Sequence, residues 1–152
     1  MSLYPLVSYS NCSSLCILIM NMLIWNCREA LNPTFCDVVY NLIQMHSPTI
    51  MVIGETKVSG ERAKRISDRI NLDGAIFANS IGLFGGLRVL WDSNQVEIAE
   101  LASTEQEVHV IITSTTKPPW LLSAIYASPR YAERQLLWKI LSLWPTFIPY
   151  PE

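Results

Sequence analysis

The chain has little charge for its length. Of its 152 residues, only 16% are Asp, Glu, Lys or Arg, whereas 50% are apolar. Acidic residues number 13 and basic residues 11, so the net charge is −2. Proteins that hold nucleic acid over a broad surface usually carry an excess of Lys and Arg, and this chain has none. We therefore expect any binding to a phosphate backbone to involve only a few local cations. The apolar residues are numerous enough for a domain with a sizeable core.

Cysteine is also scarce, and its spacing excludes two kinds of site. The four cysteines, Cys12, Cys16, Cys27 and Cys36, lack the paired Cys/His spacing of a structural zinc site. They also imply no disulfide framework, and so no oxidising compartment. We expect buried free thiols and an intracellular location, nuclear or cytoplasmic.

Residues 1–27 contain no Asp, Glu, Lys, Arg or His. A secretory signal needs a positive charge before its apolar core, and this segment offers none. A membrane span needs about 18 or more apolar residues, and Ser and Asn residues interrupt the run here. We expect residues 1–21 to be an N-terminal extension with no membrane contact. A small membrane-associated protein is the least favoured alternative.

Apolar periodicity in the first half alternates between the strand and helix periods. Asn32 is suited to cap a helix with Pro33 at its first position, and Pro48 after Ser47 is suited to end it. His46 then lies at the helix end, where a cation near the last carbonyls is favourable. Strands are predicted at residues 22–27 and 49–53, and helices from 32–33 to 47–48 and over 59–71.

The second half changes to short strands separated by turn residues, which favours antiparallel neighbours. His109 alternates with Val108 and Val110, which predicts an exposed strand face for it. The Asp92-Ser93-Asn94 string is expected to be a hairpin turn. The tail at residues 145–152 contains three prolines, which exclude a continued helix or a central strand there. The whole pattern predicts a mixed α/β (α+β) fold. Strands are predicted at residues 75–78, 86–91, 96–101, 108–113 and 120–126, and a helix at 131–144.

Three short strings follow one another along the chain, each at the end of an apolar run. They are Trp25-Asn26-Cys27-Arg28, Ile53-Gly54-Glu55-Thr56-Lys57 and the eight residues 123–130, which contain Tyr126 and Arg130. An α/β sheet gathers its site at strand ends. There the carboxylate of Glu55 suits a hard cation such as Mg²⁺, the amide of Asn26 can orient a phosphate, and the hydroxyl of Tyr126 can donate to one.

With these strings the chain resembles the N-terminal half of the endonuclease/exonuclease/phosphatase family, most closely the nuclease domains of plant non-LTR (LINE-type) retroelements. The resemblance covers residues 22–144. It implies a DNase I-like fold, here an incomplete two-sheet β-sandwich flanked by helices, and a hydrolase that cuts DNA with Mg²⁺ or Mn²⁺ and no small-molecule cofactor. It implies Asn26, Glu55 and Tyr126 as catalytic residues, Glu55 and Asn26 as metal ligands, and Arg130 and Lys57 as phosphate-binding residues.

The chain departs from the family pattern in ways that bear on activity. Relatives carry a Gly-Asp-Phe-Asn string, a further acidic residue and a Ser-Asp-His string later on, and this sequence has none of them. Glu29 replaces a common Gly, and Arg88 interrupts an apolar strand, where an inward cation is costly unless paired. We expect a truncated domain that is inactive alone and binds metal weakly or not at all. The alternative is a non-catalytic remnant or binding module that self-associates through an uncovered sheet.

Overall fold

A computed structural model describes residues 21–27, 33–54, 56–57, 61, 65, 68–78 and 86–143. Seven strands and two helices lie in this part of the chain. They are β1 (Met22–Asn26), α1 (Phe35–His46), β2 (Ile50–Gly54), β3 (Gly74–Ala78), β4 (Leu87–Trp91), β5 (Glu97–Ser103), β6 (Glu107–Thr113), β7 (Trp120–Ile125) and α3 (Tyr131–Leu143).

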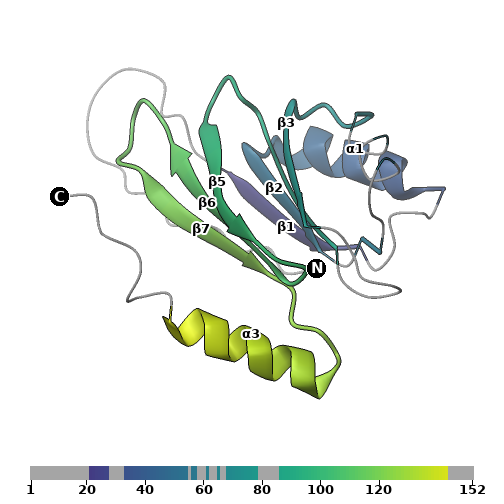
Figure 1. Cartoon of the computed structure of the whole chain (residues 1–152). Coiled ribbons are helices and arrows are strands. Elements are labelled where there is room, and N and C mark those ends of the chain that lie inside the picture. The colour runs from purple at the N-terminus through teal and green to yellow at the C-terminus, as the bar shows by residue number, and fades with distance from the viewer. Residues whose placement is uncertain are drawn as a thin grey trace.

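The strands form two sheets (Figure 1). The first has the order β1-β2-β4-β3, in which β1 and β2 are parallel and the other neighbours antiparallel. The second is the antiparallel meander β5-β6-β7. The strands β4 and β5 are joined by a tight turn but belong to different sheets. Asp92 lies in that turn, and its Oδ1 accepts a hydrogen bond from the backbone N–H of Asn94, 3.0 Å away. The predicted hairpin is wrong, because β4 and β5 do not pair with each other.

Helix α1 covers the outer face of the first sheet. It begins at Phe35, with Thr34 as N-cap and no side-chain capping bond, so the predicted start at Asn32 is too early. It ends where predicted: Ser47 takes a left-handed conformation, with φ of 44°, and its N–H donates to the carbonyl of Ile43. The ring of Phe35 stacks on Trp25 of β1, with centroids 5.6 Å apart. This contact fixes the start of α1 against the sheet edge.

A second apolar layer lies between the two sheets. Every second residue of β2 and β4 faces this layer, because side chains alternate along a strand. Ile50 and Val89 from the first sheet pack there against Val108 and Val110 from the second. The second sheet contacts β3 and β4. Ile24, on the same face of β1, is 52% exposed. The sandwich is therefore closed over β4 and β3 and open over β1.

The described helices are short. Neither α1, with 12 residues, nor α3, with 13, has the length and apolarity needed to cross a membrane. Helix α3 lies beneath β7 in Figure 1, with the second sheet between it and α1. The helix predicted over residues 59–71 falls mostly outside the described residues.

Two polar residues of the strands are more buried than their sequence context suggests. His109 is 1% exposed, so its predicted exposed position is wrong. Alternation correctly assigns it to the face opposite Val108, but that face is covered. Arg88 points inward, toward the α1 side, and is also 1% exposed. Burial lowers its pKa, against the opposite influence of the thiols of Cys27 and Cys36. Its guanidinium lies 5.9 Å from the ring centroid of Phe77, a contact that offsets part of the desolvation cost.

Candidate functional site

Asn26 is the last residue of β1, at the open edge of the first sheet. It pairs in register with Gly54, the last residue of the parallel strand β2, and Gly54 pairs with Leu87 at the start of β4. Trp25 and Cys27 pack toward α1. Because side chains alternate, Asn26 points to the side of the second sheet, and it is exposed there. Asn26 is therefore an exposed residue at the carboxyl end of two parallel strands.

Glu55 lies outside the described residues, and the residues on either side of it are held by the sheet. Gly54 ends β2, and the backbone N–H of Thr56 donates to the carbonyl of Gly86, 3.2 Å away. Thr56 is 1% exposed. Lys57 has φ of 53°, a left-handed backbone conformation that residues other than Gly, Asn and Asp seldom adopt. The chain therefore turns sharply at Lys57, directly after the buried Thr56.

Tyr126 follows β7 at the same end of the sandwich as Asn26. A tight turn reverses the chain between β4 and β5, so β5 runs opposite to β4, and β7 runs in the same direction as β5. Since β2 is antiparallel to β4, the strands β1, β2 and β7 all end on one side (Figure 1). The half-buried ring of Tyr126 packs against the apolar layer between the sheets. Asn26 and Tyr126 thus share one end of the fold.

The loop between β7 and α3 is tied down by Gln106, in the turn before β6. The carbonyl of Gln106 accepts a hydrogen bond from the N–H of Tyr126 at 2.7 Å. Its side-chain Oε1 accepts from the N–H of Ser128 at 3.1 Å, and its Nε2 donates to the carbonyl of Glu133 at 3.1 Å. Arg134 adds hydrogen bonds to the carbonyls of Ser128 and Pro129. Nothing in the sequence pattern singles out Gln106, because its role depends on contacts between distant segments.

Arg130 ends this loop and is mostly exposed, at 61% for its side chain. Its Nη1 lies 3.1 Å from Oε1 of Glu133, one turn into α3. The Ser128 hydroxyl, and after it the Arg130 guanidinium, hold the pKa of Glu133 below its usual value. An incoming phosphate would therefore compete with Glu133 for Arg130.

The described residues do not contain a metal centre. No three or more His, Cys, Asp or Glu side chains come together among them to hold an ion. Of the two predicted ligands, the described part of the chain includes only Asn26, and Mg²⁺ takes about six oxygen ligands. The described residues alone therefore do not fit a bound Mg²⁺.

Several solved structures are similar to this chain over most of its length. An AP endonuclease from Leishmania major matches 82% of this chain with a TM-score of 0.57 and 13% identity. A protein of unknown function from Enterococcus faecalis matches 82% at 0.58 and 16%. TDP2 from D. rerio, complexed with a single-stranded DNA product, matches 84% at 0.54 and 13%. The chain has the DNase I-like fold.

This DNase I-like chain is shorter than the structures it resembles. It covers 45%, 59% and 55% of the lengths of those three proteins, respectively. No protein-family model matches the chain, and no curated protein sequence is significantly similar to it. The likeness therefore establishes the fold.

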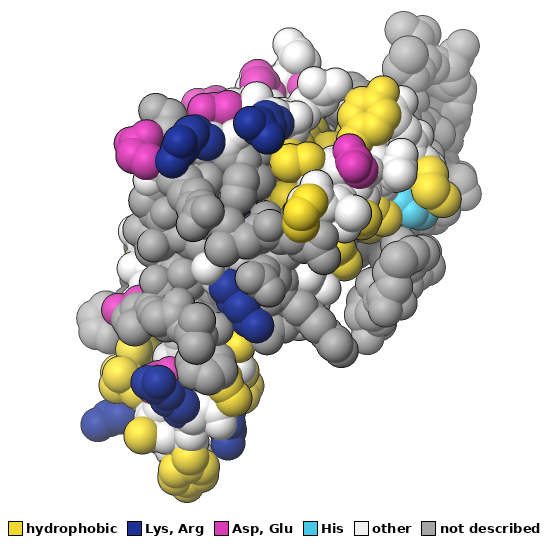
Figure 2. Space-filling view, turned by 90° about the vertical axis from the view of Figure 1, so that its right-hand side faces the viewer, with side chains coloured by type: hydrophobic (Ala, Val, Ile, Leu, Met, Phe, Trp, Pro, Cys, Tyr) yellow, Lys and Arg dark blue, Asp and Glu magenta, His cyan; other side chains and the backbone are white. Residues whose placement is uncertain are grey.

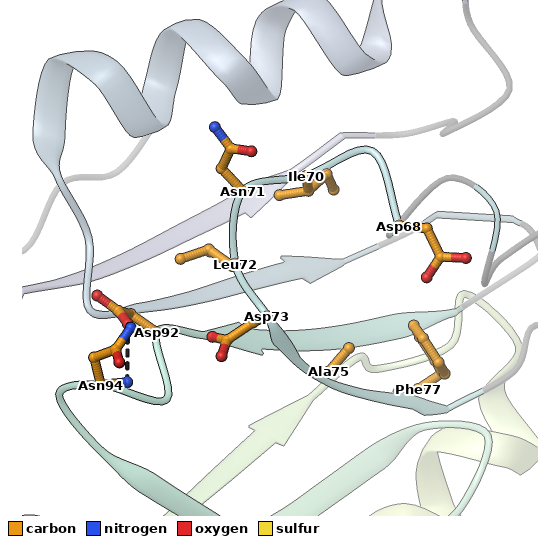
Figure 3. Close-up of a pocket in the computed structure, with 9 residues that line it drawn as sticks. All are labelled: Asp68, Ile70, Asn71, Leu72, Asp73, Ala75, Phe77, Asp92 and Asn94. Atoms are coloured by element: carbon orange, nitrogen blue, oxygen red, sulfur yellow. Dashed lines mark hydrogen bonds between the residues drawn. The ribbon is translucent and has the colours of Figure 1, made fainter.

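The pocket found among the described residues lies away from the predicted site (Figure 3). Its volume is about 830 Å³, and Asp68, Asp73 and Asp92 contribute to its wall. Asp92 lies at the opposite end of the first sheet from Asn26, whereas Phe77 and Asp68 line the pocket toward the other end of β3. Ile70, Leu72 and Ala75 of this wall pack in the α1-side core, and Asn26 points to the other side of the sheet. Three carboxylates would repel a phosphate backbone. This pocket is not the predicted nuclease site.

Basic side chains are dispersed on the described surface. In the face shown in Figure 2, Lys and Arg side chains occupy separate places, including a group on α3 at the lower left. Arg65 and Arg69 are exposed, with Glu61 and Asp68 close by in sequence. This distribution agrees with the net charge of −2. Attraction for a nucleic acid would therefore depend on a few local cations.

Proposed function

We propose that residues 22–144 are the N-terminal portion of a divalent-metal-dependent DNA phosphodiesterase domain of retroelement type, preceded by an extension at 1–21 and followed by a tail at 145–152. The observation that supports this function is the common end of β1, β2 and β7, with Asn26 and Tyr126 closing two of these strands. Arg130 follows four residues after Tyr126. The fold is one that an AP endonuclease and a DNA-bound TDP2 also have.

In this proposal the residues of the site either hold the metal ion or contact the phosphate, and Asn26 does both. Glu55 and Asn26 would hold Mg²⁺ or Mn²⁺ through their side-chain oxygens, and the bound ion would neutralise charge on the phosphate. The hydroxyl of Tyr126 donates a hydrogen bond to a phosphate oxygen. Arg130 and Lys57 bind the backbone beside the scissile bond. The amide of Asn26 orients the phosphate from the edge of the first sheet.

We further propose that this chain does not cleave DNA by itself. Hydrolysis needs a base to activate water and a group to protonate the leaving oxygen. One carboxylate, one amide and one phenol do not supply both functions along with a metal cage. The histidines lie elsewhere: His46 ends α1, and His109 is buried in the second sheet. Phosphate binding without turnover is the expected behaviour.

A nicking assay tests this proposal. Supercoiled plasmid is incubated with the full chain in Mg²⁺ or Mn²⁺, with the Glu55→Ala variant prepared in parallel. We expect both proteins to leave the plasmid at the level of the protein-free control. Cleavage by the wild-type chain that is lost in Glu55→Ala would disprove the proposed inactivity and support the proposed site. Cleavage that is equal in both would remove Glu55 from the mechanism.

A second candidate function is a non-catalytic module that self-associates through the first sheet. The observation in its favour is Ile24, which is 52% exposed at the centre of β1. Within the described residues β1 is an edge strand, and its residues 22–25 are all apolar. Apolar edge strands without a charge or proline favour pairing with another strand. Analytical ultracentrifugation of Ile24→Lys tests this function, since the added charge should abolish concentration-dependent association.

A further inference from the structure

Three polar side chains meet on the outer face of the second sheet, opposite the face against which the ring of Tyr126 packs. Glu107 and His109 lie two residues apart on β6, and Ser123 lies opposite His109 on β7. Their neighbours Val108 and Val110 pack into the layer between the sheets. Because side chains alternate, the three polar groups face the other way. They form a row of carboxylate, imidazole and hydroxyl.

The distances link the three groups in order. His109 Nδ1 lies 2.8 Å from the Oγ atom of Ser123. His109 Nε2 lies 3.2 Å from Oε2 of Glu107, within ion-pair distance, although the ring N–H is not aligned for a straight hydrogen bond. A carboxylate beside Nε2 favours the tautomer with its proton on that nitrogen. Nδ1 is then the acceptor, and the hydroxyl of Ser123 donates to it.

Exposure differs sharply along this row. Glu107 and His109 are 2% and 1% exposed, whereas Ser123 is an exposed residue. Burial strengthens the electrostatic coupling between the carboxylate and the imidazole. Ser123, at the end of the row, is therefore the one member that reaches solvent. Leu121 and Ile125, two residues to either side on the same face, are 36% and 41% exposed. An apolar strip therefore flanks the accessible Ser123.

The backbone of β7 adds a donor at the same place. The N–H of Tyr126 donates to the carbonyl of Gln106, which identifies these residues as a hydrogen-bonded pair. Pairs alternate along an antiparallel ladder, so Ser123 and His109 form a non-hydrogen-bonded pair with closely spaced side chains. The N–H of Ser123 accordingly points away from β6, to the side where the described sheet ends. It is suited to donate to an oxygen bound beside Oγ.

We propose that Ser123 is a nucleophile that accepts the acyl group of a small apolar ester, with His109 as its base. Oγ attacks the carbonyl carbon and forms a new ester bond, while the bond to the leaving alcohol breaks. The proton of Oγ passes to Nδ1 of His109 and then to the departing alkoxide. Glu107 is a positioning residue that holds the tautomer of His109. Water then attacks the acyl group by the reverse sequence and regenerates the hydroxyl. This activity is separate from the proposed phosphodiester function.

The experiment uses the full chain with two probes. An alkyl fluorophosphonate traps the nucleophile by losing fluoride, and peptide mass spectrometry locates the adduct. Release of p-nitrophenol from p-nitrophenyl butyrate measures acyl transfer. We expect the adduct on Ser123 and its loss in Ser123→Ala. Ser103, on β5 of the same sheet, is the matched control, because its hydroxyl lies 2.5 Å from the Glu100 carboxylate and not against an imidazole. Ser103→Ala should label like the wild-type chain.

Two variants test the row behind Ser123. His109→Gln should slow labelling by about 100-fold or more, the usual share of a positioned base. Glu107→Gln should slow it by a smaller factor, because the base remains. Circular dichroism shows whether each variant is folded, and the wild-type chain in urea gives the rate of an unactivated serine. Equal labelling of Ser123 and Ser103, a wild-type rate no faster than in urea, or a folded His109→Gln variant that labels at the wild-type rate would each overturn the proposal.

Discussion

The Oε1 atom of Gln106 accepts a hydrogen bond from the backbone N–H of Ser128, 3.1 Å away, across the end of the second sheet. The same side chain donates to the carbonyl of Glu133 in α3. A turn residue thereby holds both ends of the loop that carries Tyr126 and Arg130. One amide side chain thus makes two of the hydrogen bonds that order this loop, beside those that Arg134 makes to Ser128 and Pro129.

We predict that Gln106→Ala loosens this loop. Each buried or half-buried partner left without its hydrogen bond costs about 1 kcal/mol, so the free energy of unfolding should fall by roughly 1–2 kcal/mol. Hydrogen exchange at the amide of Ser128 should speed up more than exchange in the strands. Gln135→Ala, at an exposed position of α3, is the matched control and should change little. Unchanged protection at Ser128 would show that the loop is held by other contacts.

Leu137 is the buried side chain of α3, at 1% exposed, and the adjacent Leu136 is 57% exposed. Truncating a buried leucine costs about 2–5 kcal/mol, whereas an exposed position usually stays within about 0.5 kcal/mol. We therefore predict a large loss of stability for Leu137→Ala and almost none for Leu136→Ala. Urea unfolding of the two variants measures both values. Similar losses would mean that α3 packs through a different face.

Much of this fold is predictable from the sequence, because each strand and helix carries its own period. The runs ending at Asn26 and Gly54, and the helix that stops before Pro48, follow from apolar spacing and proline. The order β1-β2-β4-β3 does not follow, since a period identifies the face of a strand and not its neighbour. The position of β5 in the second sheet depends in the same way on packing between distant segments.

In the candidate site, too, some features follow from the local sequence and others depend on contacts between distant segments. Apolar runs identify Asn26 and Tyr126 as residues at the ends of strands, which local pattern is able to indicate. Only the topology shows that these strands, which belong to different sheets, end on the same side. His109 shows the limit, because alternation assigns its face and leaves open whether that face is covered. Gln106 is recognisable only once β6, β7 and α3 are in place. Contacts between segments far apart in sequence decide these cases.

Substitutions of Arg130 and Glu133 should change the affinity for phosphate in opposite directions. Their ion pair of 3.1 Å is exposed, so it contributes little to stability. We predict that Glu133→Gln strengthens binding of a single-stranded DNA oligonucleotide, because Arg130 no longer has a competing carboxylate. Arg130→Gln should weaken binding by about the contribution of one phosphate contact and lower its salt dependence by about one unit of slope. Fluorescence anisotropy across a salt series measures both. Lys139→Gln, elsewhere on α3, serves as the charge control.

The turn between β4 and β5 leads to a prediction about acid. The Asp92 carboxylate accepts hydrogen bonds from Nε2 of Gln95 at 2.8 Å and from the N–H of Asn94 at 3.0 Å. These bonds, that of Gln95 first, lower the pKa of Asp92 from its ordinary 3.8. The unfolded chain therefore takes up this proton at a higher pH than the folded chain. The stabilisation is complete above pH 3.8 and is lost as the pH falls through the folded pKa.

We accordingly predict that Asp92→Asn makes the free energy of unfolding less dependent on pH under acidic conditions. The free energy of unfolding, measured by urea titration from about pH 5 to about pH 3, should fall less steeply in the variant than in the wild-type chain. Asp68→Asn, which removes an exposed carboxylate from the same pocket, controls for the change in net charge. If both variants alter the slope equally, net charge explains the effect and the hydrogen bonds to Asp92 do not. A smaller change in Asp68→Asn assigns the acid sensitivity to the turn that directs the chain from one sheet into the other.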